Sequence, residues 1–128
     1  MIVIDASIAI DALLRTPRGL RAVPHVFHEE RHAPFLIDLE FASSLRRMVR
    51  AGLDGALART ALETMRDWTI HRHAHMPLLG RIWELRDSLT AYDASYVALA
   101  EFLDAPLVTA DAKIGRAHGH NARIVVLS

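Results

Sequence analysis

Short apolar runs alternate with longer helix-like segments along the chain, and this alternation constrains the fold more than any other feature. The first run, residues 1–5, is a continuous Ile- and Val-rich segment of the kind that forms a strand buried on both faces. Strands that alternate with helices form a parallel sheet covered by helices on both sides. The pattern therefore predicts an α/β fold, with a central, mostly parallel sheet. The expected strands cover residues 1–5, 32–34 (a short edge strand), 68–74, 107–109 and 124–127.

Helices are predicted where apolar residues recur at helical spacing. A break at residues 16–19 separates the first two helices, and Gly52 ends the helix that precedes it. These connections are short, as expected for a compact unit. The expected helices cover residues 6–14, 20–30, 36–51, 54–67, 77–86, 90–104 and 111–117.

Composition limits the classes of site that the chain can carry. Its 128 residues are 52% hydrophobic, which predicts one domain, residues 1–128, with a sizeable core. The absence of cysteine excludes disulfides, zinc–thiolate sites and thiol catalysis. No run is long enough to span a membrane and no secretory signal is visible, so we expect a cytoplasmic protein without membrane partners. A net charge of zero argues against a non-specific nucleic-acid coat but not against a nucleic-acid enzyme.

Four carboxylates fall at positions that this fold would bring together. Asp5 ends the first strand and Asp111 follows the strand at 107–109, at the carboxyl ends where open α/β sheets place their sites. Glu40 lies on the helix from residue 36, and Asp93 lies in the first turn of the helix from residue 90. Clustered carboxylates repel one another, and a set of oxygen ligands selects Mg²⁺ or Mn²⁺. The pattern indicates metal-assisted attack on a phosphodiester.

Each of these carboxylates also has an ordinary structural explanation. Asp5 and Asp111 could cap the helices that follow them. Asp93 could complete a capping box with Thr90. Glu40 could be a solvated side chain at the border of an apolar helix face. The prediction of a metal site depends on the four acids taken together.

In this order and at these separations, the acids resemble the PIN-domain nucleases, and most closely the VapC toxins of bacterial toxin–antitoxin pairs. The resemblance covers the whole chain and includes a three-layer α/β/α architecture. Its most specific part is LTAYDASYVALA, which is similar to the family helix that carries the third acid. The segments that carry the resemblance are residues 2–7, 39–46, 89–100 and 106–111.

The resemblance implies an endoribonuclease that depends on Mg²⁺ or Mn²⁺, with all four acids binding one or two cations and Asp111 at the family's most variable position. Ser7 and Thr109 would support the ligands. Attack by water would leave a 5′-phosphate and a free 3′-hydroxyl. The family also implies a homodimer and a neutralising VapB-like antitoxin, which we expect around the helix from Leu36 and the helices near the N-terminus.

Two groups of arginines are the best candidates for contact with RNA phosphates, although a solvated face is the alternative for both. One group follows the first helix and the other lies on the helix that carries Glu40. The candidates are Arg15, Arg18, Arg46, Arg47 and Arg50.

Three histidines, His71, His73 and His75, alternate along the expected strand at 68–74 and would share one of its faces. Such a tract could bind a metal, since imidazole suits zinc and nickel. We favour the interpretation that they flank the edge of a strand, because the acidic quartet requires oxygen ligands.

Three other classes of protein share parts of this pattern. A phosphatase of the haloacid-dehalogenase type also starts with a strand ending in Asp, but it needs a second Asp where this chain has Ser7. A phospho-receiver domain needs a late lysine at a strand end, and Lys113 follows Asp111 too closely. A degenerate PIN domain that only binds RNA or a partner is disfavoured because all four acids are present.

Overall fold

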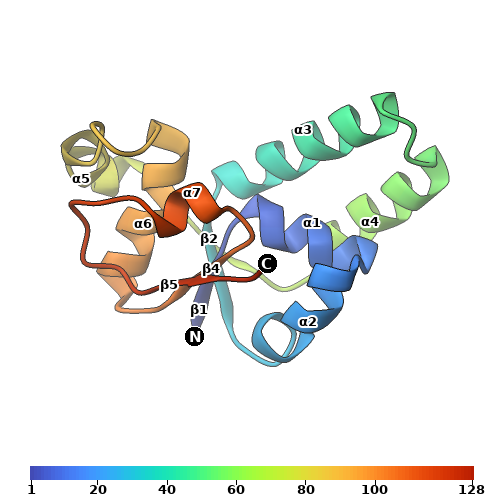
Figure 1. Ribbon diagram of the computed structural model, residues 1–128, viewed down its shortest axis with the longest axis horizontal. Helices are drawn as coiled ribbons and strands as arrows, with labels where there is room; N and C mark the ends of the chain where they lie inside the picture. The colour runs from blue at the N-terminus through green and yellow to red at the C-terminus, as the bar shows by residue number, and fades with distance from the viewer.

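Five parallel strands form one sheet with helices on both sides in the computed structural model, which describes residues 1–128 (Figure 1). The strand order is β3-β2-β1-β4-β5. The chain thus extends the sheet from β1 in one direction and later from β4 in the other, so the order reverses between β1 and β4. This is the switch point where open α/β sheets hold their ligands. The strands are β1 (Ile2–Ile4), β2 (Arg31–Pro34), β3 (His71–His73), β4 (Leu107–Thr109) and β5 (Ile124–Val126).

Helices cover the two faces of the sheet unequally. On one side α1 packs against α2, α3 and α4, and on the other α6 packs against β1, β2 and β4 with α5 beside it. Figure 1 shows α3 and α4 as a long hairpin that projects away from the sheet. The α/β fold with helices on both faces is confirmed. The helices are α1 (Ala6–Leu14), α2 (Pro17–Val26), α3 (Leu36–Arg50), α4 (Gly55–Asp67), the 3₁₀ helix η1 (Met76–Leu78), α5 (Leu79–Glu84), α6 (Ala91–Leu103) and α7 (Ala112–Gly115).

A core of 31 buried hydrophobic residues lies between the sheet and its helices. Strands β1 and β4 are buried along their whole length, and every residue of α6 from Ala94 to Ala100 is buried. The small side chains of α6 let the helix lie close to the sheet. Asp93, one residue before this buried stretch, is therefore held on a rigid element.

Helix α2 starts earlier and ends earlier than the predicted span of 20–30. Thr16 caps it by accepting a hydrogen bond from the Gly19 amide (3.0 Å), and Pro17 occupies the first turn, where proline needs no amide hydrogen. The expected break at 16–19 is thus the start of the helix. Gly19 is required there, because a Cβ atom would lie 1.8 Å from the Asp11 carbonyl oxygen of α1.

The prediction that residues 32–34 form an edge strand is wrong, since β2 pairs with β1 on one side and β3 on the other. The edge strands are β3 and β5, and β3 is shorter than the predicted 68–74. Trp68 instead ends α4 and packs on Phe27, and His75 lies beyond the strand. Polar residues make β2 look exposed, but its buried histidine has side-chain partners on both ring nitrogens.

No helix has the length and apolar character needed to cross a membrane.

Candidate active site

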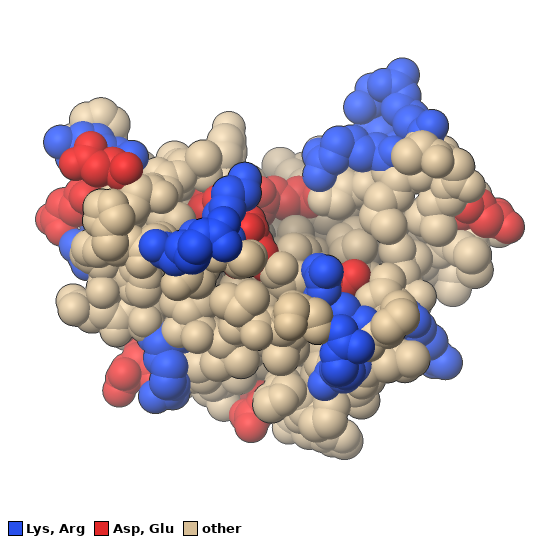
Figure 2. Space-filling view, viewed as in Figure 1, with Lys and Arg blue, Asp and Glu red and all other residues tan.

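All four predicted acids line one cleft of about 550 Å³ at the carboxyl ends of β1 and β4, between α3 and α6. Figure 2 shows acidic side chains in the hollow between the surface over α3 and the surface over α7, with basic side chains nearby. The structure thus brings together residues from four separate segments. Those that line the cleft include Asp5, Ser7, Glu40, Arg47, Tyr92, Asp93, Tyr96 and Asp111.

Asp5 is the most buried of the acids, with 5% of its surface exposed. Its Oδ1 accepts hydrogen bonds from Ser7 Oγ (2.6 Å) and from the Ile8 amide (3.1 Å), and its Oδ2 accepts one from Thr109 Oγ1. It therefore caps α1 and faces the cleft at once. Burial raises the pKa of Asp5 to about 6, although these hydrogen bonds oppose the rise.

Ser7 and Thr109 connect the ends of the two central strands. Ser7 Oγ accepts a hydrogen bond from the Ala110 amide (3.1 Å), and Thr109 Oγ1 accepts one from the Asp111 amide (2.9 Å). Both hydroxyls also donate to Asp5. The network holds the Asp5 carboxylate in one orientation and fixes the start of the segment that carries Asp111.

Glu40 receives a hydrogen bond from the opposite wall of the cleft. The hydroxyl of Tyr96, on α6, donates to Glu40 Oε1 at 2.6 Å, and the tyrosine is 1% exposed. Burial raises the pKa of Glu40, and the bond from Tyr96 lowers it. Burial and the Glu40 charge both raise the pKa of Tyr96, so its hydroxyl keeps its proton. The tyrosine therefore orients Glu40 as a carboxylate acceptor.

Asp111 combines the capping role expected of it with a place in the cleft, whereas Asp93 lines the cleft and forms only the Thr90 half of the expected capping box. Thr90 caps α6 by accepting a hydrogen bond from the Asp93 amide (3.2 Å), which leaves the Asp93 carboxylate free to face the cleft. Burial first, and then the charge of Asp111, raise the pKa of Asp93. Asp111 caps α7 through the Lys113 amide (2.8 Å).

Of the five candidate arginines, only Arg47 lines the cleft. Its Nη2 donates to Ser44 Oγ (3.0 Å) on the same helix. Arg46 and Arg50 line a different groove, between α3 and α4. Arg18 donates to Asp11 (3.2 Å) next to the junction of α1 and α2, and Arg15 ends α1 there.

The cleft has an excess of negative charge that its own residues do not neutralise. Burial raises the pKa of three of its acids, which means that their ionised forms lack full solvation. The side chains that line the cleft offer carboxylate and hydroxyl oxygens, and such oxygens suit a hard divalent cation. Such a cleft can bind a cation and, through it, a phosphate group.

Comparison with known proteins gives the family. The family model described as PIN domain matches residues 2–119. The chain belongs to the PIN-domain family. Within it, the chain is similar to VapC ribonucleases, among them two from Mycobacterium tuberculosis. It is 47% identical to ribonuclease VapC9 over 115 residues, which cover 89% of this chain and 88% of the relative. It is 34% identical to ribonuclease VapC12 over 129 residues, the full length of both.

A solved structure shares the fold of this PIN domain. The chain matches VapBC2 from Rickettsia felis, a structure described as bound to a DNA fragment from its promoter, with a TM-score of 0.67. The match covers 100% of both chains at 14% sequence identity, so it shows the fold alone.

Two tyrosines of the PIN-domain cleft, Tyr92 and Tyr96, do not follow from the spacing of acids and strands. Tyr96 lies three residues after Asp93 and therefore shares its helix face, which is the one sequence signal that could have placed it near the site. Its bond to Glu40 spans 56 residues of sequence, and no local pattern predicts such a contact.

Proposed function

We propose that this chain is an endoribonuclease that depends on Mg²⁺ or Mn²⁺ and acts as the toxin of a type II toxin–antitoxin pair. One observation carries the proposal: in a member of the VapC ribonucleases, carboxylates from four separate segments line a single cleft. The fold itself hosts many functions, and the argument therefore depends on this site.

Asp5, Glu40, Asp93 and Asp111 are the residues that would hold the cation. Their donor set is all oxygen, and the raised pKa of the first three marks the unneutralised charge that a divalent cation would compensate. When bound, the cation supplies a Lewis acid that stabilises charge on the phosphate and activates water.

The protein's own side chains orient the ligands and the substrate. Ser7 and Thr109 fix the Asp5 carboxylate, and Tyr96 fixes Glu40. Arg47 places a positive charge on the cleft wall, where an RNA phosphate would approach. Water adds to phosphorus as the bond to the 3′-oxygen breaks, so the products carry a 5′-phosphate and a 3′-hydroxyl.

Cleavage of total RNA by the purified protein tests the proposal. We expect discrete cuts with Mg²⁺ or Mn²⁺, ends that carry 5′-phosphates, and no cuts with EDTA. Loss of a residue that only supports a metal ligand typically lowers activity by roughly 10–100-fold. The matched Asp93→Asn protein should lose more activity than this, because Asp93 would bind the cation directly. Cleavage by wild type that persists in EDTA, or cleavage by Asp93→Asn at the wild-type rate, would contradict the assignment.

Arg47→Ala should weaken RNA binding about tenfold, while Arg50→Ala should leave it within about twofold, since only Arg47 lines the cleft. Both arginines are exposed on α3, so the pair is matched for helix position and charge. Fluorescence anisotropy with a labelled single-stranded RNA, in the Asp93→Asn background, measures the difference. We also expect a smaller salt dependence for Arg47→Ala alone. Equal losses in both variants would place the RNA elsewhere.

A toxin of this kind also requires an antitoxin, and we expect a VapB-like chain to cover the cleft of a homodimer. Exposed apolar side chains at the cleft, Leu39 (71% exposed) and Tyr92 (61% exposed), suit a protein partner. An arginine from that partner would compete with the cation for the carboxylates, because guanidinium pairs with them in a bidentate manner.

A further inference from the structure

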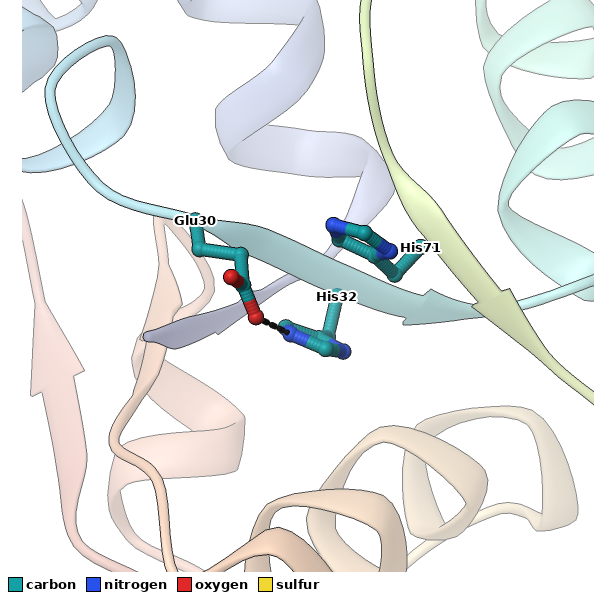
Figure 3. Close-up of side chains that lie close together, drawn as sticks. All are labelled: Glu30, His32 and His71. Atoms are coloured by element: carbon teal, nitrogen blue, oxygen red, sulfur yellow. Dashed lines mark hydrogen bonds and ion pairs between the residues drawn. The ribbon is translucent and has the colours of Figure 1, made fainter.

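A second cluster of potential metal ligands lies at the opposite end of the sheet from the acidic cleft. It comprises Glu30, just before β2, His32 within β2, and His71 at the start of β3 (Figure 3). One ligand atom from each lies within 4.8 Å of the other two. Continuing the pairing of Val3 with His32 places Asp5 level with Pro34, roughly 13 Å along the strand from Glu30. The two clusters are therefore separate.

The parallel register of β2 and β3 aligns the histidines. His32 pairs directly with His71, and their rings stack with centroids 4.8 Å apart. Because side chains alternate along a strand, His73 lies on the same face as His71. Glu30, two residues before His32, lies there too. His75 lies past the end of β3. The cluster in the structure therefore differs from the predicted tract of three alternating histidines, and it takes only His71 from that tract as a ligand.

His32 is buried (7% exposed) and has a partner on each ring nitrogen. Its Nε2 lies 2.6 Å from Glu30 Oε1, and its Nδ1 lies 2.8 Å from His73 Nε2. A proton shared between Nε2 and the carboxylate occupies the place that a cation would take. With a cation there, Nδ1–H would donate to His73 Nε2, which is the outer contact that metal-bound histidines almost always make.

We propose that Glu30, His32 and His71 form a site for a first-row transition-metal cation, with Zn²⁺ as the preferred occupant. Two imidazoles and one carboxylate are a zinc ligand set, with a fourth position left to water, whereas Mg²⁺ requires oxygen ligands. The site would join β2 to the edge strand β3. It does not depend on the proposed nuclease activity.

Binding requires a small opening of the cluster. Two ligand atoms of tetrahedral zinc lie roughly 3.3 Å apart, farther than the 2.6 Å between His32 Nε2 and Glu30 Oε1. Glu30 and His71 are exposed, so their side chains can turn while the buried His32 stays in place. The buried His32 would thus hold a fixed position, and the exposed side chains of Glu30 and His71 would turn to bind the cation from the solvent side.

Calorimetric titration with Zn²⁺ in excess Mg²⁺ tests the site on the full chain. We expect one equivalent to bind to wild type and equally to Asp93→Asn, in which the acidic cleft is disabled. His71→Ala and Glu30→Gln should each weaken binding at least tenfold, and both replace exposed side chains, so folding is preserved. His75→Ala, an exposed histidine outside the cluster, is the control and should bind within about twofold of wild type.

His73 is a positioning residue in this scheme. Its replacement by alanine should weaken Zn²⁺ binding about 10–100-fold, and His73→Gln, whose amide oxygen can accept the bond from His32, should restore most of it. Zinc should also shift the ring NMR signals of His32 and His71 but not those of His75. No binding by wild type, or binding that survives His71→Ala and Glu30→Gln and disappears in Asp93→Asn, would overturn the proposal.

Discussion

The Asp5→Asn protein should lose RNA cleavage and yet, in EDTA, be more stable than the wild type at neutral pH. Asp5 is buried, and burial raises its pKa from 3.8 to about 6, so in EDTA no cation offsets the cost of its charge. Asparagine keeps the shape and, through its Oδ1, the bonds from Ser7 and Ile8; its amide nitrogen would donate to Thr109 Oγ1 where Asp5 Oδ2 accepts, and it carries no charge. The residue would thus be retained for function at a cost in stability.

The direction of the pH effect depends on whether the folded or the unfolded state binds the Asp5 proton more tightly. The folded state holds the Asp5 proton up to about pH 6, whereas the unfolded chain loses it near 3.8. The contribution of Asp5 to the free energy of unfolding in EDTA should therefore be highest below about pH 4 and fall as the pH rises to about 6. A shift of this size corresponds to at most about 3 kcal/mol, at 1.36 kcal/mol per pKa unit.

Urea unfolding in EDTA at pH 4 and pH 7 measures this difference. We expect Asp5→Asn to exceed wild type by about 1–3 kcal/mol at pH 7 and to match it near pH 4. Asp87→Asn, at an exposed position, should change nothing at either pH. Mg²⁺ or Mn²⁺ should stabilise wild type and not Asp5→Asn, because only the intact site binds the cation in the folded state. A variant less stable than wild type at pH 7 in EDTA would show that the Asp5 charge is already compensated.

The fold could be predicted to the level of element type and order, because buried parallel strands and amphipathic helices leave periodic patterns. The errors arose where tertiary pairing overrides local pattern. His32 makes β2 look like an edge strand, yet it is buried because Glu30 and His73 satisfy its ring nitrogens. Pro17 suggested a break in the chain, but it lies in the first turn of α2, which Thr16 caps.

The acids of the site could be predicted because strand ends place Asp5 and Asp111 at a known location in any parallel sheet. Local sequence pattern did not predict the partners of the acids. Thr109 reaches Asp5 across 104 residues of sequence, and Tyr96 reaches Glu40 across 56. The sequence resemblance suggested the first contact, whereas the second depends on how α3 and α6 approach each other.

Tyr96→Phe should reduce RNA cleavage about 10–100-fold while leaving the protein folded. The change removes only the hydroxyl that donates to Glu40 at 2.6 Å, and the buried ring still fills its place in the core. Glu40 would lose the contact that orients it across the cleft. Loss of one buried hydrogen bond should lower the free energy of unfolding by about 1 kcal/mol, too little to unfold the domain.

The pH profile separates this positioning role from a structural one. The bond from Tyr96 lowers the pKa of Glu40, so its removal should raise that pKa and move the acidic limb of the cleavage profile to higher pH. Tyr92→Phe is the matched control, because Tyr92 lines the same cleft, is 61% exposed and makes no side-chain hydrogen bond. An unchanged profile in Tyr96→Phe, or equal losses in the two variants, would remove Tyr96 from the site.

If the tyrosine acts through Glu40, adding Tyr96→Phe to Glu40→Gln should reduce RNA cleavage little more than Glu40→Gln alone, because the effects of residues that act as a unit are not additive.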